Sequence, residues 1–197
     1  MMVVETIALN DSSMLGVDDT EVLRYLGVRS FDKGTIKIIR ECEVELYKLA
    51  FPKAVYSLVD ISVKENTVDF GFMKVQSKKL SKNLERCNCA YVFCATLGIS
   101  PDRYFERLLK ISPAKATVFS ACASALIERF CDYINEKIVS GARSCPRFSC
   151  GYGDFCIEHQ GEILEALQAK KELGVGLTDA YMMVPVKTVT AIIGIRR

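Results

Sequence analysis

Four residues in the run Arg147-Phe-Ser-Cys-Gly151-Tyr152-Gly153 offer the groups that a small charged ligand requires. A guanidinium can hold a carboxylate through two parallel hydrogen bonds. Glycines lack the Cβ atom, so their backbone amides can approach a ligand closely. An aromatic ring can stack on a purine or attract a sulfonium or ammonium cation. The segment therefore suits an amino acid joined to a nucleoside, of which S-adenosylmethionine is an example.

The same residues also fit a purely structural interpretation. In that interpretation the segment is a tight turn that closes a strand, Arg147 pairs with a surface acid and Tyr152 lies in the core. The pattern Arg-x-x-x-Gly-Tyr-Gly is too short to decide between the two. Other segments of the chain are needed.

Three further segments extend the pattern over most of the chain. They are the C-terminal run 174–195, the apolar segment 91–98 and the segment 121–132, which has helical spacing. Together with residues 147–155 they resemble the activation domain of vitamin B12-dependent methionine synthase, and most closely its stand-alone form. The most specific parts of this resemblance are the Arg-x-x-x-Gly-Tyr motif and the block 177–195.

The resemblance implies an α+β fold in which a curved, mainly antiparallel sheet is flanked by helices and holds the cofactor on a concave face. It also implies a function. The chain would bind S-adenosylmethionine and present its methyl group for reductive methylation of cob(II)alamin on a partner subunit, with a flavodoxin-like protein as electron donor. It would be an accessory component of a methyltransferase with no catalytic residue of its own, because the sulfonium already carries an activated methyl group and requires only positioning.

The matching motif positions predict the roles of individual residues. Arg147 would hold the methionine carboxylate, the backbone from Gly151 to Gly153 would contact polar ligand atoms, and Tyr152 would pack against the ligand. Asp154 could take the ligand's ammonium or ribose hydroxyls, and a turn-capping role is an equal alternative. Cys150 adjoins the turn and is the thiol least easily assigned to the core.

Two other positions carry open alternatives. Glu128 lies in the 121–132 segment, where it could line the cleft or be a solvated helix carboxylate. Lys187 and Thr188 interrupt an apolar block near the C-terminus, and either a position facing the cleft or an exposed strand edge would explain them.

The chain cannot itself bind cobalamin through the usual histidine. Its only histidine, His159, has Ile157 and Glu162 where the Asp-x-His-x-x-Gly pattern requires Asp and Gly. The resemblance therefore implies a separate cobalamin-binding subunit, either a methionine synthase or another corrinoid protein. The run Ala191 to Gly194 also lacks the aromatic residue that helps to hold the cofactor in the family. A non-catalytic interaction subunit that has lost S-adenosylmethionine binding is thus the alternative function.

Composition sets independent bounds. The 197 residues, half of them apolar, predict one domain over 1–197. A net charge of +2 with interspersed signs gives no reason to expect nucleic acid or a membrane surface as partner. The sequence shows neither a membrane span nor a secretory signal, which favours the cytoplasm. The nine cysteines contain no Cys-x2-Cys pair, so we expect reduced thiols and no metal site.

Apolar periodicity and turn residues predict the main elements. These are a hairpin of strands 55–63 and 67–75, a central strand over 89–96, a long helix from 113 to about 139, a short strand over 147–150, and a helix over 160–171.

Overall fold

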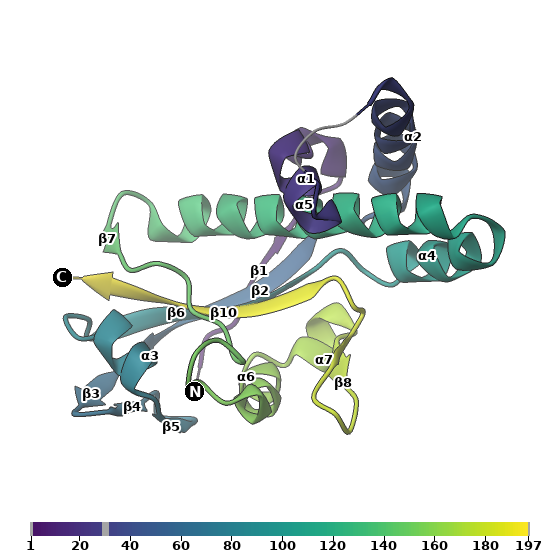
Figure 1. The fold of residues 1–197 in the computed structure, drawn as a ribbon. Helices are drawn as coiled ribbons and strands as arrows, with labels where there is room; N and C mark the ends of the chain where they lie inside the picture. The colour runs from purple at the N-terminus through teal and green to yellow at the C-terminus, as the bar shows by residue number, and fades with distance from the viewer. Residues whose placement is uncertain (1, 29–31, 197) are drawn as a thin grey trace.

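The computed structural model describes residues 2–28 and 32–196, and shows a sheet between two layers (Figure 1). The sheet has the strand order β1-β2-β6-β10-β7. Every neighbouring pair in it is antiparallel. The strands are β1 (Glu5–Ala8), β2 (Lys53–Asp60), β6 (Cys89–Thr96), β7 (Arg143–Ser144) and β10 (Thr188–Arg196). The predicted α+β class with a mainly antiparallel sheet is confirmed.

The central strand β6 separates two hydrophobic cores. Phe93 and Ala95 belong to the core on the helical side, whereas Val92 and Cys94 belong to the core on the opposite side. Successive side chains of a strand point to opposite faces, so an unbroken apolar run is what a strand covered on both faces requires. The strand predicted over 89–96 is confirmed.

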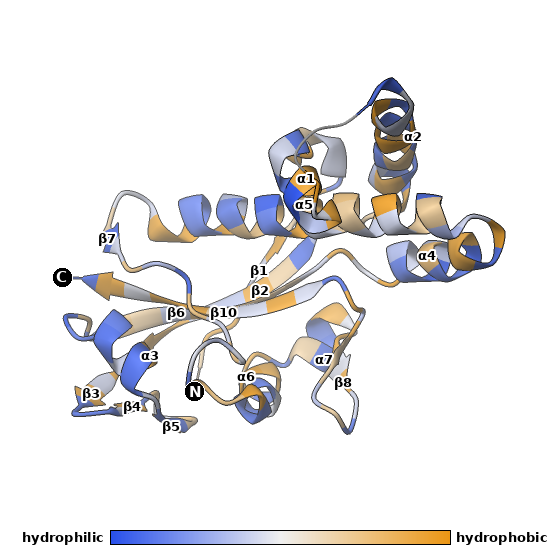
Figure 2. Cartoon of the chain, viewed as in Figure 1, coloured by the Kyte–Doolittle hydropathy of each residue, from blue (hydrophilic) through white to orange (hydrophobic). Residues whose placement is uncertain are grey.

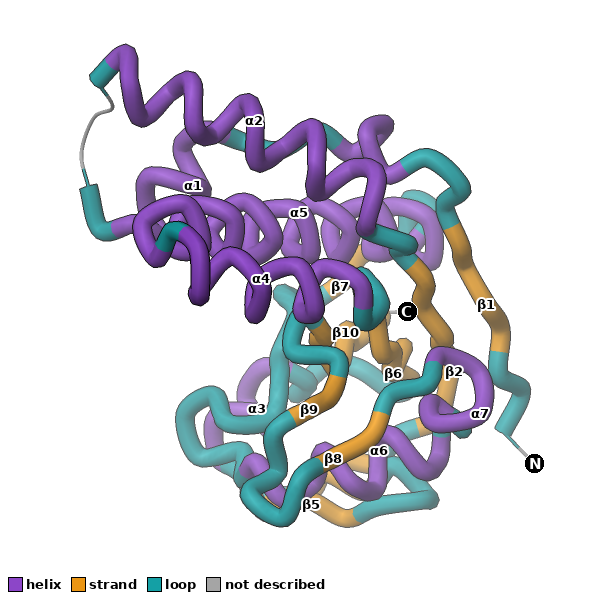
Figure 3. Tube along the Cα trace, turned by 90° about the vertical axis from the view of Figure 1, so that its right-hand side faces the viewer, coloured by secondary structure: helices purple, strands orange, loops and turns teal. Residues whose placement is uncertain are grey.

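Four helices form the layer on one side of the sheet, and the long helix α5 lies directly across it (Figure 3). Ser112 accepts a hydrogen bond from the Lys115 amide and caps α5, and Pro113 occupies the first turn, as the sequence predicts. The helices are α1 (Asp19–Leu26), α2 (Lys33–Leu49), α4 (Ser100–Ile111) and α5 (Pro113–Val139), with a 3-10 turn at Ser12–Leu15. The other three helices all pack against α5.

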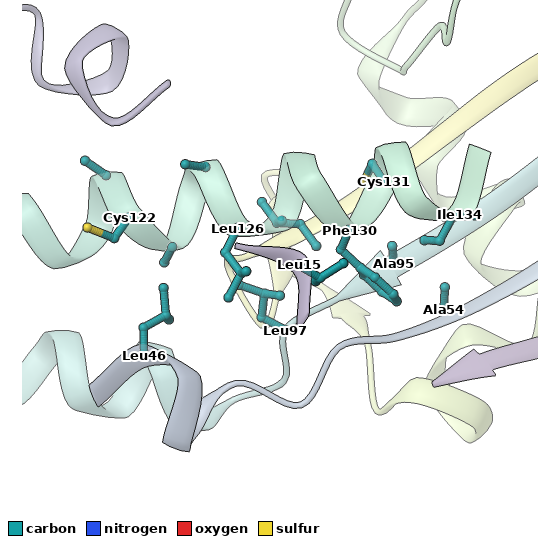
Figure 4. Packing of buried hydrophobic residues seen from close by; sticks show 14 of the residues in the cluster. Leu15, Leu46, Ala54, Ala95, Leu97, Cys122, Leu126, Phe130, Cys131 and Ile134 are labelled. Atoms are coloured by element: carbon teal, nitrogen blue, oxygen red, sulfur yellow. The ribbon is translucent and has the colours of Figure 1, made fainter. Parts of the chain in front are cut away.

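The core beneath α5 is filled by large side chains that face small ones. Phe130 and Ile134 project from α5 towards Ala54 and Ala95 of the sheet, and Leu126 points towards Leu97 (Figure 4). Figure 2 shows hydrophilic residues among the turns of the C-terminal half of α5, away from this core. This half of the helix therefore has a polar side available to a binding site.

The layer on the other side of the sheet is a mixture of short elements. It contains a small sheet of β3 (Ser62–Lys64), β4 (Thr67–Asp69) and β5 (Lys74–Gln76), the helices α3 (Lys78–Asn83), α6 (Gln160–Ala166) and α7 (Ala169–Leu173), a 3-10 turn at Ile157–His159, and the hairpin of β8 (Gly176–Leu177) and β9 (Met183–Val184). The predicted hairpin of strands 55–63 and 67–75 is present only in part: its turn joins β3 to β4, β2 belongs to the main sheet, and the second predicted strand is divided into β4 and β5. The helix predicted over 160–171 is divided at Gln168, whose φ is 52°. None of the helices in the described ranges is long and apolar enough to cross a membrane.

Candidate ligand-binding site

The segment that carries Arg147 is fixed to the outer side of β10. The Cys145 amide donates to the Gly194 carbonyl at 2.8 Å, and Phe148 and Ile192 exchange hydrogen bonds of 2.9 and 2.8 Å. Only this isolated bridge at Phe148 is present where a strand was predicted over 147–150, because the regular pairing in this region is confined to β7. Arg147 is therefore held at a fixed position by its neighbours on both sides.

The Arg147 side chain lies against the polar side of α5. Its Nη2 atom is 3.1 Å from Oε2 of Glu128 and 3.0 Å from Oδ1 of Asp132. Glu128 and Asp132 are four residues apart on a helix, so their side chains lie on the same face. The structure thus brings Arg147 and Glu128 together and adds Asp132, which sequence reasoning missed. The pairing of Arg147 with acids is also what the structural interpretation of this residue predicts.

The guanidinium of Arg147 is only partly used. The side chain is 24% exposed, and both carboxylates approach the same nitrogen, Nη2. The Nη1 atom is buried and has no hydrogen-bond partner within the described residues. A buried donor without an acceptor costs about 1–3 kcal/mol, and more when it is charged. This atom is therefore a charged donor that has no acceptor among the described residues.

The glycine turn is closed by its own hydrogen bonds. The Gly151 amide donates to the Phe155 carbonyl at 2.8 Å, and the Tyr152 amide donates to the Ser149 carbonyl at 3.2 Å. Gly151 and Gly153 have φ values of 82° and 68°, which disfavour residues with a Cβ atom. The expectation that these amides are free does not hold for Gly151 and Tyr152. Their contact with a ligand remains a prediction that requires the turn to open.

Tyr152 is not a core residue, as the structural interpretation of the turn required. Its side chain is 67% exposed. The ring contacts Phe148 edge to face, with the ring centroids 5.3 Å apart. Phe148 itself is buried in the core on the side of the sheet away from α5. Tyr152 can therefore present a ring face. It does so beside the core on the side of the sheet away from α5, whereas Arg147 faces α5.

Asp154 caps a neighbouring helix. Its carboxylate accepts hydrogen bonds from the Ser77 hydroxyl at 2.5 Å and from the amides of Lys78 and Lys79 at 2.8 and 3.2 Å. The capping alternative thus describes its contacts here, although the capped helix is α3 and not the turn itself. These hydrogen bonds, the Ser77 bond first, lower the pKa of Asp154 below its usual value.

We expect Asp154→Asn to lower the thermal unfolding midpoint at neutral pH. A depressed folded-state pKa contributes stability that is present above the unfolded-state pKa and is lost as the pH falls through the folded-state pKa. The difference in midpoint between the wild type and the variant should therefore shrink below pH about 4. Calorimetric melts across pH 3–7 measure it. A difference that is constant across this range would contradict the assigned role of the carboxylate.

Cys150 packs against the core on the side of the sheet away from α5. It is partly buried, and burial raises the pKa of its thiol to about 12. A thiol with a raised pKa is mostly protonated at neutral pH and is a poor nucleophile. Its contact with a ligand remains a prediction, and its chemistry here is that of a small apolar residue.

A second cation lies on the same side of α5. The Lys187 Nζ atom donates to the hydroxyls of Ser120 and Ser124 at 3.1 and 2.8 Å. Lys187 thus faces α5, whereas Thr188 is buried and donates to the Thr96 hydroxyl at 2.9 Å. The positions 120, 124, 128 and 132 form one polar stripe along α5. The sequence already contained this four-residue spacing, which places the four side chains on one face of the helix.

These features define an α+β protein in which an antiparallel sheet is covered by a long helix, with a polar stripe of that helix facing two cations. The crystal structure of the MetH reactivation domain bound to AdoHcy has this fold. It matches 98% of this chain and 78% of that chain with a TM-score of 0.73 and 15% sequence identity. No protein-family model and no curated protein matches the sequence. The structural match shows that this chain has the fold of a methionine synthase reactivation domain.

Proposed function

We propose that this chain binds S-adenosylmethionine and serves as the reactivation component of a cobalamin-dependent methionine synthase whose cobalamin resides on a separate subunit. The unpaired Nη1 atom of Arg147 carries the proposal, because it is a buried cationic donor in a chain with the reactivation-domain fold. The solved structure with this fold binds AdoHcy, which differs from S-adenosylmethionine by one methyl group.

The residues around Arg147 fit the amino-acid end of such a ligand. Nη1 of Arg147 can donate to a carboxylate oxygen, and Glu128 and Asp132 supply two carboxylates beside it for the ammonium group. Opposite charges placed side by side in this way recognise a zwitterion. The exposed ring of Tyr152 is available to the nucleoside end if the ligand crosses the rim of the sheet.

In this proposal the chain contributes positioning. S-adenosylmethionine, when bound, supplies an activated methyl group. Arg147 and Glu128 fix the orientation of the ligand, and the rigid attachment of residues 145–148 to β10 holds the arginine in place. The cobalamin-binding subunit and a flavodoxin-like electron donor are the partners that this function requires. A client from another corrinoid methyltransferase system would use the same site.

The test is calorimetric titration of S-adenosylmethionine into the reduced protein and into Arg147→Ala. Loss of a charged hydrogen bond predicts affinity weaker by roughly ten- to a hundredfold. Arg147→Lys should recover only part of it, because an ammonium cannot reproduce the guanidinium fork. Arg143→Ala, which removes an exposed arginine from the same edge of the sheet, is the matched control and should bind as the wild type does. Equal binding by the wild type and Arg147→Ala would refute the assigned site.

A non-catalytic interaction subunit is the second candidate, and a specific observation favours it. Arg147 is already neutralised by two carboxylates, and the Gly151 and Tyr152 amides are used within the turn. If no S-adenosylmethionine binds to the wild type, equilibrium dialysis should be repeated with a cobalamin-loaded methionine synthase present. Binding only in its presence supports a site completed by the partner, and no binding in either case supports the interaction subunit.

A further inference from the structure

A partly open cavity lies at the other end of the polar stripe, between α4, α5 and the segment that leads into β10. Its volume is about 90 Å³. Phe105 and Phe119 form apolar walls, and the polar lining residues are Asp102, Glu106, Ser120 and Lys187. None of these residues belongs to the cluster of Arg147, Glu128 and Asp132, the Arg147 cluster.

Lys187 lines this cavity, and its ammonium group contacts neutral hydroxyls and no carboxylate within the described residues. Its ammonium group has three donors, and the structure assigns two of them to the neutral hydroxyls of Ser120 and Ser124. Within the described residues Lys187 forms no ion pair. Burial lowers the pKa of Lys187, because it removes the charged form from water. The backbone is fixed nearby, since the Leu97 amide donates to the Lys187 carbonyl at 3.0 Å.

Asp102 supplies the opposite charge on the same cavity. Its Oδ2 atom accepts a hydrogen bond from the Val186 amide at 2.7 Å, and burial raises the pKa of this carboxyl group. Among the described residues Asp102 and Lys187 are not in ion-pair contact with each other, although the negative charge of Asp102 favours the protonated form of Lys187. A cation and an anion are therefore both partly buried and both lack a directly opposed partner.

We propose that this cavity binds a small α-amino acid with an apolar side chain. The ligand carboxylate would accept from Lys187, its ammonium would donate to Asp102, and its side chain would pack against Phe105 and Phe119. One water requires about 10–15 Å³ of such volume, so the cavity accommodates about six to nine groups of that size. That capacity suits a compact amino acid and is too small for a nucleoside.

The probe is L-norvaline, with pentanoate and butylamine as analogues that lack the ammonium and the carboxylate, respectively. Each is titrated into the full chain by calorimetry and by ¹H–¹⁵N spectra. We expect norvaline to bind more tightly than either analogue by roughly tenfold or more, the value of one charged hydrogen bond. The amides of Val186 and Ser120 should respond first. Equal affinity for the three compounds, or no binding of norvaline at millimolar concentration, would overturn the proposal.

Two substitutions assign the two charges. Lys187→Met keeps most of the side-chain volume and should weaken both norvaline and pentanoate about tenfold. Asp102→Asn can still accept from the Val186 amide and should weaken norvaline while leaving pentanoate unchanged. Lys110→Met, on the exposed side of α4, is the matched control and should bind as the wild type does. Unchanged norvaline affinity in Lys187→Met would contradict the proposed site.

This inference stands apart from the proposed function. Arg147→Ala should bind norvaline normally, and Lys187→Met should bind S-adenosylmethionine normally. Failure of one titration therefore leaves the other intact. If Arg147→Ala abolished norvaline binding, the amino acid would occupy the Arg147 cluster and the cavity assignment would be wrong.

Discussion

Phe130→Ala is expected to lower the free energy of unfolding by about 3–5 kcal/mol, the usual cost of removing a buried aromatic ring. Phe130 is 0% exposed and is among the largest fully buried side chains of the chain. Its ring projects from α5 towards Ala54 and Ala95 (Figure 4). Alanines have no side-chain length with which to fill the space that the ring would leave. The cavity should therefore persist, which places the cost high in this range.

Urea unfolding followed by circular dichroism measures this effect, and an unchanged slope with denaturant would show that the denatured state is unaffected. Arg129→Ala is the matched control, because Arg129 adjoins Phe130 but is exposed, and its ion pair within the described residues is with Asp132, at 3.8 Å. An exposed pair of this kind contributes little, so the control should stay within about 0.5 kcal/mol of the wild type. A loss below about 1 kcal/mol in Phe130→Ala would mean that α5 can move towards the sheet and close the cavity.

Features set by local pattern were predictable from the sequence. The central strand over 89–96 was readable because an apolar run of that length fits a strand with two covered faces. The start of α5 was readable because Ser112 and Pro113 form a local start signal. The overall α+β class followed from the order of such elements.

Features set by contacts between distant segments were not predictable in the same way. Ser77 is the local N-cap of α3, but the second carboxylate cap comes from Asp154, which follows Ser77 by 77 positions, so nothing in the sequence around either residue shows their contact. Lys187 meets Ser120 across 67 positions for the same reason. The occupied amide of Gly151 depends on how the turn closes on Phe155, which the Gly-Tyr-Gly motif alone does not specify.

The Arg147 cluster lies between these two cases. Glu128 and Arg147 were both candidate site residues from the sequence, but their direct pairing required the fold to place α5 over the outer side of β10. Asp132 was missed because its relation to Glu128 is meaningful only when a partner faces that side of the helix. A pair of acids four residues apart is otherwise an ordinary solvated helix face.

Gly194→Val is expected to destabilise the protein by about 3 kcal/mol, at the upper end of the usual cost of overpacking. A Cβ atom at Gly194 would lie 2.5 Å from Cδ2 of Leu84 and 2.7 Å from Sγ of Cys87. Both neighbours are buried, so neither can move into solvent. Intrinsic strand propensity favours valine by at most about 1 kcal/mol, and the packing cost therefore decides the sign.

The same substitution should also disturb the candidate site. The Gly194 carbonyl accepts the Cys145 amide hydrogen bond that fixes the segment before Arg147. Its strand must shift to accept a larger residue, so affinity for any ligand held by Arg147 should fall with stability. Gly161→Ala is the matched control: a Cβ atom there would be 3.8 Å from Leu177, an ordinary contact, and alanine in a helix should stabilise by about 0.5–1 kcal/mol. Thermal melts of both variants, with S-adenosylmethionine titrations beside them, give the comparison. If Gly194→Val is stable and binds normally, Leu84 and Cys87 move aside and β10 keeps its position, and the predicted cost of overpacking is wrong.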